Sequence, residues 1–188
     1  MSFGRRELRD ILVAFLVLSF VFAYPEALTQ PTFFLLSMIA VGVAFVGHEL
    51  SHRYVARRFG YFAAFRLWPQ GLLLAFLFTF VTNGAFIFAA PGAVVFGSPY
   101  IFKEHRKDEV GKIGVAGPVF NLLMYGVFMT LAFLFTIPEL AFAARINAWL
   151  ALFNLIPIAP LDGQKVLSWN KGAWGAALIL AGLGVFAF

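Results

Sequence analysis

The chain has 188 residues, of which 62% are hydrophobic and only 12% carry a charge. Soluble domains carry roughly twice that charged fraction, and a water-soluble chain of this size has too little interior to bury so much apolar surface. The charged residues are clustered, and six stretches of 15 to 36 residues contain none. A bilayer core of about 30 Å takes roughly 20 apolar residues per helix. The composition therefore excludes a soluble fold and predicts an all-α polytopic membrane protein.

The net charge of +5 reports orientation in a membrane and not a nucleic-acid partner. Lys and Arg lie beside apolar stretches, as the positive-inside rule describes for the cytoplasmic ends of spans. No basic stripe is interleaved with exposed aromatic residues, so we expect no nucleic-acid binding. The chain has no Cys, which excludes thiol nucleophiles and Cys-based zinc sites.

The first expected span covers residues 11–23 and follows three Arg, which place the N-terminus on the cytoplasmic side. A cleaved signal peptide is the alternative interpretation of this segment. A second span covers about 32–59 and enters from outside. It ends in Arg53, Arg57 and Arg58, which is typical of a cytoplasmic end.

Residues 67–102 form a stretch that is too long for one crossing and short for two. Its middle contains the turn signal Thr82-Asn83-Gly84, and residues 93–96 resemble a strand. A basic loop follows, and it stays on the cytoplasmic side only if the stretch crosses the membrane an even number of times. We therefore expect a membrane-associated re-entrant or β-hairpin element, with its non-helical backbone buried in protein or facing a water-filled cavity.

The remaining spans are expected at about 114–136, 144–161 and 172–188. The whole chain, 1–188, then forms a single integral membrane domain with about five to six transmembrane helices. Nearly all Lys and Arg lie on the inner side of this arrangement, which predicts a multi-pass protein of the cell membrane.

An H-E-x-x-H motif runs from His48 to His52 within the second expected span. On a helix, residues four apart share a face, so both imidazoles can bind one metal ion, and Glu49 can reach a metal-bound water. The site lies roughly 24 Å along the helix from its outer end, toward the cytoplasmic side. A pair of His capping a helix end is the alternative, but ionisable groups inside a membrane span are costly and usually functional.

A catalytic zinc site usually takes three protein ligands and leaves one position open for water. His105 lies in a highly charged loop, where solvent exposure is the simpler interpretation. Asp162 is better placed, because it follows an apolar span at nearly the depth of His48. A simple turn at Asp162-Gly163 is the alternative. A meeting of His48 and Asp162 again requires an even number of crossings between their spans.

Two further motifs accompany the His pair: Gly117-Pro118-x-x-Asn121, and the run from Asn154 to Gly163 with the pattern N-x-x-P-x-x-P-L-D-G. In this order and spacing, the chain resembles the site-2 protease family of intramembrane zinc metalloproteases over about residues 32–170. The resemblance is to a minimal member, because the chain has no room for a PDZ or CBS domain.

This resemblance implies that His48, His52 and Asp162 bind Zn²⁺ and that Glu49 is the general base. It places Asn121 and Asn154 near the site, where both could bind the substrate backbone; interhelical packing is the alternative for each. It further implies an endopeptidase that cleaves transmembrane segments of other membrane proteins within the bilayer, as in regulated intramembrane proteolysis.

A membrane metal-ion transporter or sensor could use the same His/His/Asp site. Glu49 separates the two hypotheses, because a transporter needs no base beside the His pair. An inactive module that binds membrane helices is a third hypothesis, and the complete ligand set argues against it.

Overall fold

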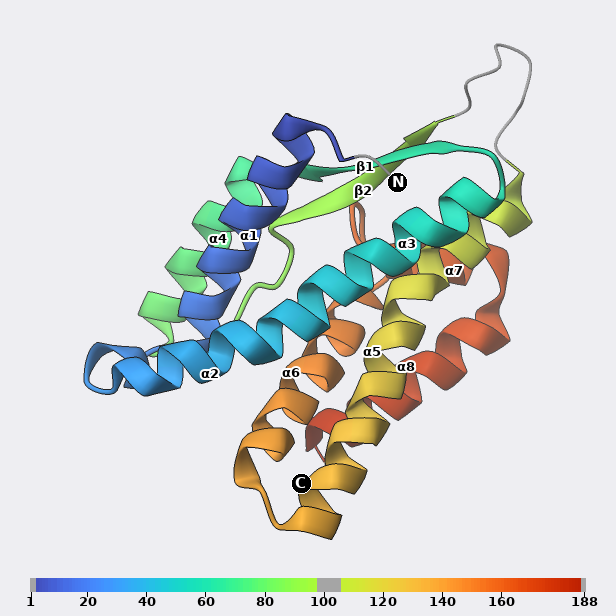
Figure 1. Ribbon diagram of the computed structural model, residues 1–188. Coiled ribbons are helices and arrows are strands. Elements are labelled where there is room, and N and C mark those ends of the chain that lie inside the picture. The colour runs from blue at the N-terminus through green and yellow to red at the C-terminus, as the bar shows by residue number, and fades with distance from the viewer. Residues whose placement is uncertain (1–2, 98–105, 187–188) are drawn as a thin grey trace.

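The structure is a computed structural model that describes residues 3–97 and 106–186. Within these ranges the chain is mostly helical, with one two-stranded sheet at one end of the molecule (Figure 1). The elements are α1 (Arg5–Ala23), α2 (Pro31–Val41), α3 (Gly47–Arg58), β1 (Phe62–Leu67), α4 (Pro69–Val81), β2 (Gly92–Gly97), α5 (Lys107–Phe135), α6 (Pro138–Asn154), α7 (Asp162–Trp169) and α8 (Lys171–Phe186).

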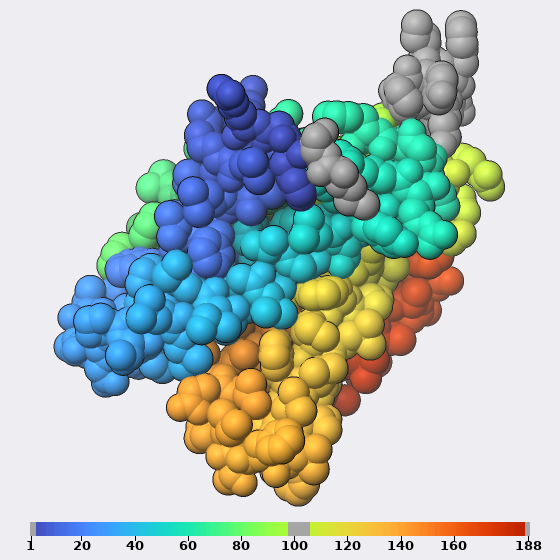
Figure 2. Space-filling view, in the orientation of Figure 1, coloured from blue at the N-terminus to red at the C-terminus, as the bar shows by residue number. Residues whose placement is uncertain are grey.

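One continuous helix of 28 residues, Pro31–Arg58, crosses the molecule and carries the H-E-x-x-H motif (Figures 1 and 2). It joins α2 to α3 through a π-helical turn at Gly42–Val46, directly before the motif. A π-turn inserts one extra residue and so changes which face the following residues present; such turns are frequent at functional sites. The turn therefore helps to set the direction in which His48 points.

The end of α3 reverses the chain and starts the sheet. Gly60 adopts a φ of +81°, and the amides of Gly60 and Tyr61 donate to the carbonyls of Arg57 and Ala56. This is the Schellman arrangement, in which a left-handed glycine closes the last turn of a helix. The Tyr61 hydroxyl then donates to Glu109 Oε2 at 2.6 Å. Burial and this hydrogen bond raise the pKa of Tyr61, so it stays protonated and fastens the end of α3 to α5.

The sheet differs from the expected hairpin within residues 67–102. A strand does form there, since β2 covers the run expected to be strand-like. Its antiparallel partner is β1, in register from Phe62↔Gly97 to Leu67↔Gly92, and β1 lies almost entirely before residue 67. Between the strands the chain forms α4, which ends in the expected turn with Asn83 and Gly84 at positive φ.

Two helices in the described part of the chain are long and apolar enough to cross a membrane: Pro31–Arg58 and Lys107–Phe135. The expected span at 144–161 corresponds to α6, which starts earlier, at Pro138, and ends at Asn154, so that Asp162 begins the separate helix α7. Helices α6, α7 and α8 pack against α5. The total of five to six spans and the re-entrant element stay predictions.

A buried ion pair connects the N-terminal helix to the motif helix. Glu7 and Arg53 are each about 4% exposed at the side chain, and their Oε2 and Nη2 atoms lie 3.3 Å apart. Glu7 Oε1 also accepts a hydrogen bond from the Phe65 amide, at 3.2 Å. The helix begins at Arg5 and not at residue 11 because Glu7 is part of the interior contact and not of a solvated tail.

Candidate metal centre

Three side chains from two distant parts of the sequence converge on one point. His48 and His52 lie on α3, one helical turn apart, and Asp162 is the first residue of α7. Asp162 Oδ2 lies 2.8 Å from His52 Nε2 and 3.3 Å from His48 Nε2, and the two Nε2 atoms are 2.9 Å apart. All three residues are at most 7% exposed. The structure thus brings together the three side chains that the sequence indicated as candidate ligands.

Hydrogen bonds on the far side of each imidazole direct Nε2 toward this point. His52 Nδ1 donates to the carbonyl of Ile113 at 2.6 Å, and His48 Nδ1 lies 2.5 Å from Asn121 Oδ1. Asn121 must present its oxygen to His48, because its Nδ2 donates to Ala44 O at 2.9 Å and to Asn147 Oδ1 at 3.0 Å. Both imidazoles therefore carry a proton on Nδ1, and this tautomer directs Nε2 toward the point of convergence, where it can bind a metal ion.

The donor set fits a zinc ion. Two Nε2 lone pairs and one carboxylate oxygen face one another within 4.8 Å, and such electron-rich atoms repel unless a cation lies between them. Ligand atoms about 2.0 to 2.1 Å from a tetrahedral zinc lie roughly 3.3 Å apart, close to the separations here. Two imidazoles and a carboxylate give three protein ligands, which leaves a fourth position open.

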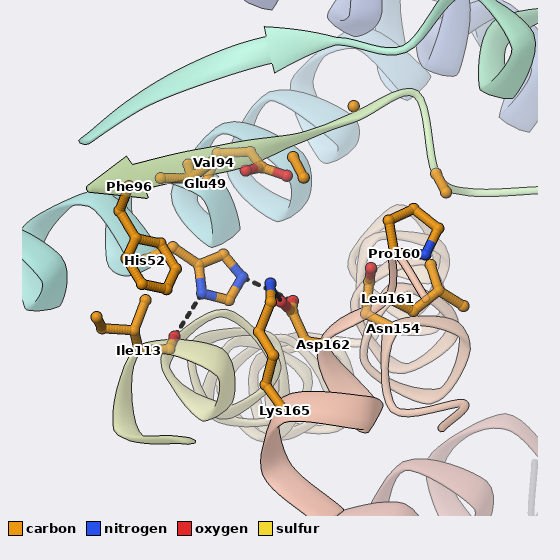
Figure 3. A pocket seen from close by; sticks show the side chains of 13 residues that line it. Glu49, His52, Val94, Phe96, Ile113, Asn154, Pro160, Leu161, Asp162 and Lys165 are labelled. Atoms are coloured by element: carbon orange, nitrogen blue, oxygen red, sulfur yellow. Dashed lines mark hydrogen bonds and ion pairs between the residues drawn. The ribbon is translucent and has the colours of Figure 1, made fainter. Parts of the chain in front are cut away.

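Lys165 holds the other oxygen of the Asp162 carboxylate. Its Nζ lies 2.8 Å from Oδ1, one turn along α7, so that Oδ2 alone faces the imidazoles. Figure 3 shows Lys165 and Asp162 approaching His52 from the same side. The sequence analysis did not single out Lys165; its spacing of three residues from Asp162 on a helix was the available signal.

Glu49 lies beside the metal ligands and lines a small cavity. Its carboxyl group faces the backbone of Val94 on β2 (Figure 3), and its Oε2 atom is buried without a hydrogen-bond partner among the described residues. The cavity has a volume of about 20 Å³ and is also lined by His52, Asp162 and Lys165. That volume holds about one water molecule. A buried carboxylate oxygen with free acceptor capacity thus faces a space of the size of the reactive water.

The two Asn residues occupy different positions. Asn121 is fully buried, and its amide is occupied by His48, Ala44 and Asn147, so the structure gives it a positioning role at a metal ligand. Asn154 donates to Leu150 O at 2.9 Å and lines the cavity next to Glu49. A contact of Asn154 with substrate stays a prediction. Asn147 was missed, although a polar residue within an apolar span could have pointed to it. His105 lies outside the described residues.

Gly117 makes room for the His pair. A Cβ atom at this position would overlap Nε2 of both His48 and His52. The glycine of the Gly117-Pro118-x-x-Asn121 motif therefore lets α5 approach the two ligands, while Asn121, one turn further on, orients one of them. The motif serves the metal centre through close packing and through a hydrogen bond.

A Gly117→Ala variant is expected to bind zinc about 10- to 100-fold more weakly, as occurs when support of the ligands is lost. The added methyl group forces the imidazoles away from their converged positions. The measurement is competition for zinc with a chelator. Gly126→Ala on the same helix is the control, because a Cβ there meets nothing within 4 Å, and it should leave zinc affinity unchanged. Equal affinities of the two variants would contradict this role of Gly117.

Three curated proteins resemble the chain. One from Methanocaldococcus jannaschii, named "Putative zinc metalloprotease MJ0611", is 42% identical over 178 residues, which cover 92% of this chain and 88% of that protein. "Putative zinc metalloprotease YwhC" from Bacillus subtilis is 32% identical over 69% of this chain and 66% of its own length. "Zinc metalloprotease MJ0392" from M. jannaschii is 25% identical over 84% of this chain and 41% of its own length.

No protein-family model matches the chain, and no solved structure matches it with significance. The match at 42% identity covers nearly the whole of both proteins, and this alone establishes the family of the chain. The name of this relative, a zinc metalloprotease, agrees with a His/His/Asp centre and an adjacent glutamate, which are the groups of a hydrolytic zinc site. The chain belongs to this family of zinc metalloproteases.

Proposed function

We propose that the protein is an intramembrane zinc endopeptidase of the site-2 protease type, which cleaves transmembrane segments of other membrane proteins. The observation that carries the proposal is the position of the motif. His48, Glu49 and His52 lie in the more polar C-terminal half of a continuous helix of 28 residues, directly after its apolar part, and the helix as a whole is long enough to span a bilayer. A hydrolytic site at that depth can be reached by a peptide bond that is itself within the membrane.

The chemistry follows from the side chains at the centre. Bound zinc would lower the pKa of its water to about 7 and polarise the scissile carbonyl. Glu49, whose carboxyl group faces the small cavity, accepts the proton of the attacking water and delivers it to the leaving amine. Asn121, Ile113 and Lys165 keep the three ligands in place. A helical substrate must unwind first, because its carbonyls are otherwise hydrogen-bonded within the helix.

We further propose that the whole chain forms one multi-pass domain with its N-terminus and its active-site side facing the cytoplasm. Arg57 and Arg58 end the motif helix, and three Arg lie at the start of α1, near that same end (Figure 1). The positive-inside rule assigns such ends to the cytoplasmic side. The partners are then the lipid bilayer and a transmembrane protein substrate.

A transporter or sensor function is less consistent with the site. The buried carboxylate of Glu49 lies next to the ligands without being one of the three that converge. A binding site for transient metal has no use for such a group, and burial of a carboxylate is costly. A protease requires it as the base.

The test uses the purified protein in liposomes with a transmembrane test substrate. We expect cleavage within the apolar segment of the substrate, loss of cleavage after zinc is removed with a chelator, and recovery with Zn²⁺ but not with Mg²⁺, which prefers oxygen ligands in an octahedral arrangement. Mass spectrometry of the products locates the cut. Cuts confined to the soluble flanks of the substrate would contradict intramembrane cleavage.

A further inference from the structure

A second cavity adjoins the one at the metal centre. It has a volume of about 430 Å³ and shares Pro160 and Leu161 with the small cavity, and these are the two residues directly before the ligand Asp162. Its lining is apolar throughout. Half of the lining residues are aromatic: Trp68, Phe78, Phe86, Phe88 and Phe153.

The aromatic side chains that line the cavity also contact one another. Phe88 and Phe153 meet edge to face with ring centroids 5.0 Å apart, and Phe78 and Phe86 do so at 5.4 Å. Such pairs stabilise each other by about 0.5 to 1.5 kcal/mol beyond the burial of their area. They come from α4, from the segment after it and from the end of α6, so three separate parts of the chain hold the cavity open.

The small cavity cannot hold a substrate side chain, since its volume of about 20 Å³ corresponds to about one water molecule. A scissile bond in front of Glu49 nevertheless carries one residue on each side, with Cα atoms about 3.8 Å apart. One of these side chains therefore needs a larger space close to the small cavity. The larger, apolar cavity is adjacent to the small one at Pro160 and Leu161 and offers such a space.

We propose that this cavity is a specificity pocket for the residue next to the scissile bond, and that it selects bulky apolar and aromatic side chains. The inference rests on the proposed protease function and adds the class of substrate. Substrate sites are usually pockets lined by apolar and aromatic side chains, with a few polar groups at defined positions. An acyl chain of a lipid is the competing occupant, and it would leave no preference among substrates.

The test measures cleavage of a set of transmembrane substrates that differ at one position. Mass spectrometry first locates the scissile bond, and the residue on each side is then changed in turn to Ala, Leu, Phe or Asp. At one of the two positions we expect kcat/KM to be at least about tenfold higher for Leu and Phe than for Ala, with Asp below Ala. A flat profile at both positions would overturn the proposal.

Variants of the pocket connect the preference to this cavity. Ile158 lines it and is 63% exposed, so Ile158→Trp should fill the mouth and bring the Phe-to-Ala ratio of kcat/KM close to one. Ile179 on α8 is 65% exposed and lies outside the lining, so Ile179→Trp is the matched control and should keep the wild-type ratio. Phe78→Ala, which enlarges the cavity, should instead shift the preference from Leu toward the larger Phe.

A preference that survives both Ile158→Trp and Phe78→Ala would place the selecting pocket elsewhere and overturn the proposal. Thermal unfolding checks that each variant is folded. If Ile158→Trp does not fold, the result for Phe78→Ala decides the test. A wild-type protein that cleaves none of the substrates would instead refute the protease function itself, and the pocket with it. The two failures are thus distinguishable.

Discussion

A Glu49→Gln variant is expected to bind zinc as the wild type does and to lose cleavage, with kcat lower by about 10²- to 10⁴-fold, the usual contribution of a general base. Gln keeps the shape of the side chain but cannot accept the proton of the attacking water. The three ligands His48, His52 and Asp162 are untouched. Elemental analysis gives the zinc content, and cleavage of a transmembrane substrate in liposomes gives kcat.

The matched control for this variant is Glu109→Gln. Glu109 is as buried as Glu49, at 8% exposure, but it contacts Tyr61 and not the metal centre. It is therefore expected to retain most of the activity, although the contact with Tyr61 is weakened. Cleavage by Glu49→Gln at the wild-type rate would refute the role of Glu49 as base and, with it, the protease assignment.

An Asp162→Ala variant should lose the metal itself. Asp162 Oδ2 is the only carboxylate oxygen that faces both imidazoles in the described part of the chain, and without it two protein ligands remain. We expect zinc affinity to fall by at least about 100-fold, beyond the 10- to 100-fold that loss of an outer partner costs. Isothermal titration with zinc, with and without a competing chelator, measures the change.

Asp10→Ala is the matched control, because Asp10 is likewise a buried aspartate, 3% exposed, but lies on α1 beside Arg9. It should bind zinc with wild-type affinity. Full zinc affinity in Asp162→Ala would show that the third ligand is another residue, and His105, outside the described residues, would then be the next to test.

The three candidate metal ligands could be identified from the sequence because each carries a local signal. The i, i+4 spacing of His48 and His52 defines a helix face, and Asp162 is a rare charge at the end of an apolar run. Depth along the spans was enough to predict that the three meet, and the structure confirms it. The mostly helical fold was predictable for a related reason, since long apolar stretches favour helices.

What the sequence did not reveal depends on pairings between distant segments. β1 contains Arg66 and is too short to be recognised alone, and its partner β2 lies some 30 residues away across α4. Gly117 could be identified as a motif residue. The need for glycine there arises from the two imidazoles on another helix, which leave no space for a side chain. Asn147 is a polar residue in an apolar run, but its role depends on its hydrogen bond to Asn121 and, through Asn121, on the contact with His48 on another helix.

The Glu7–Arg53 pair has a consequence for the limits of the catalytic unit. All recognisable motifs fall between residues 32 and 170, yet Arg53, the neighbour of a metal ligand, is neutralised by a carboxylate from α1. Removing one partner of a buried ion pair costs about 3 to 5 kcal/mol, a large share of the stability of a domain. The shortest segment that contains every motif is therefore shorter than the segment that can hold them in place. The first helix, α1, carries none of the motifs and is nevertheless part of the scaffold of the candidate metal centre.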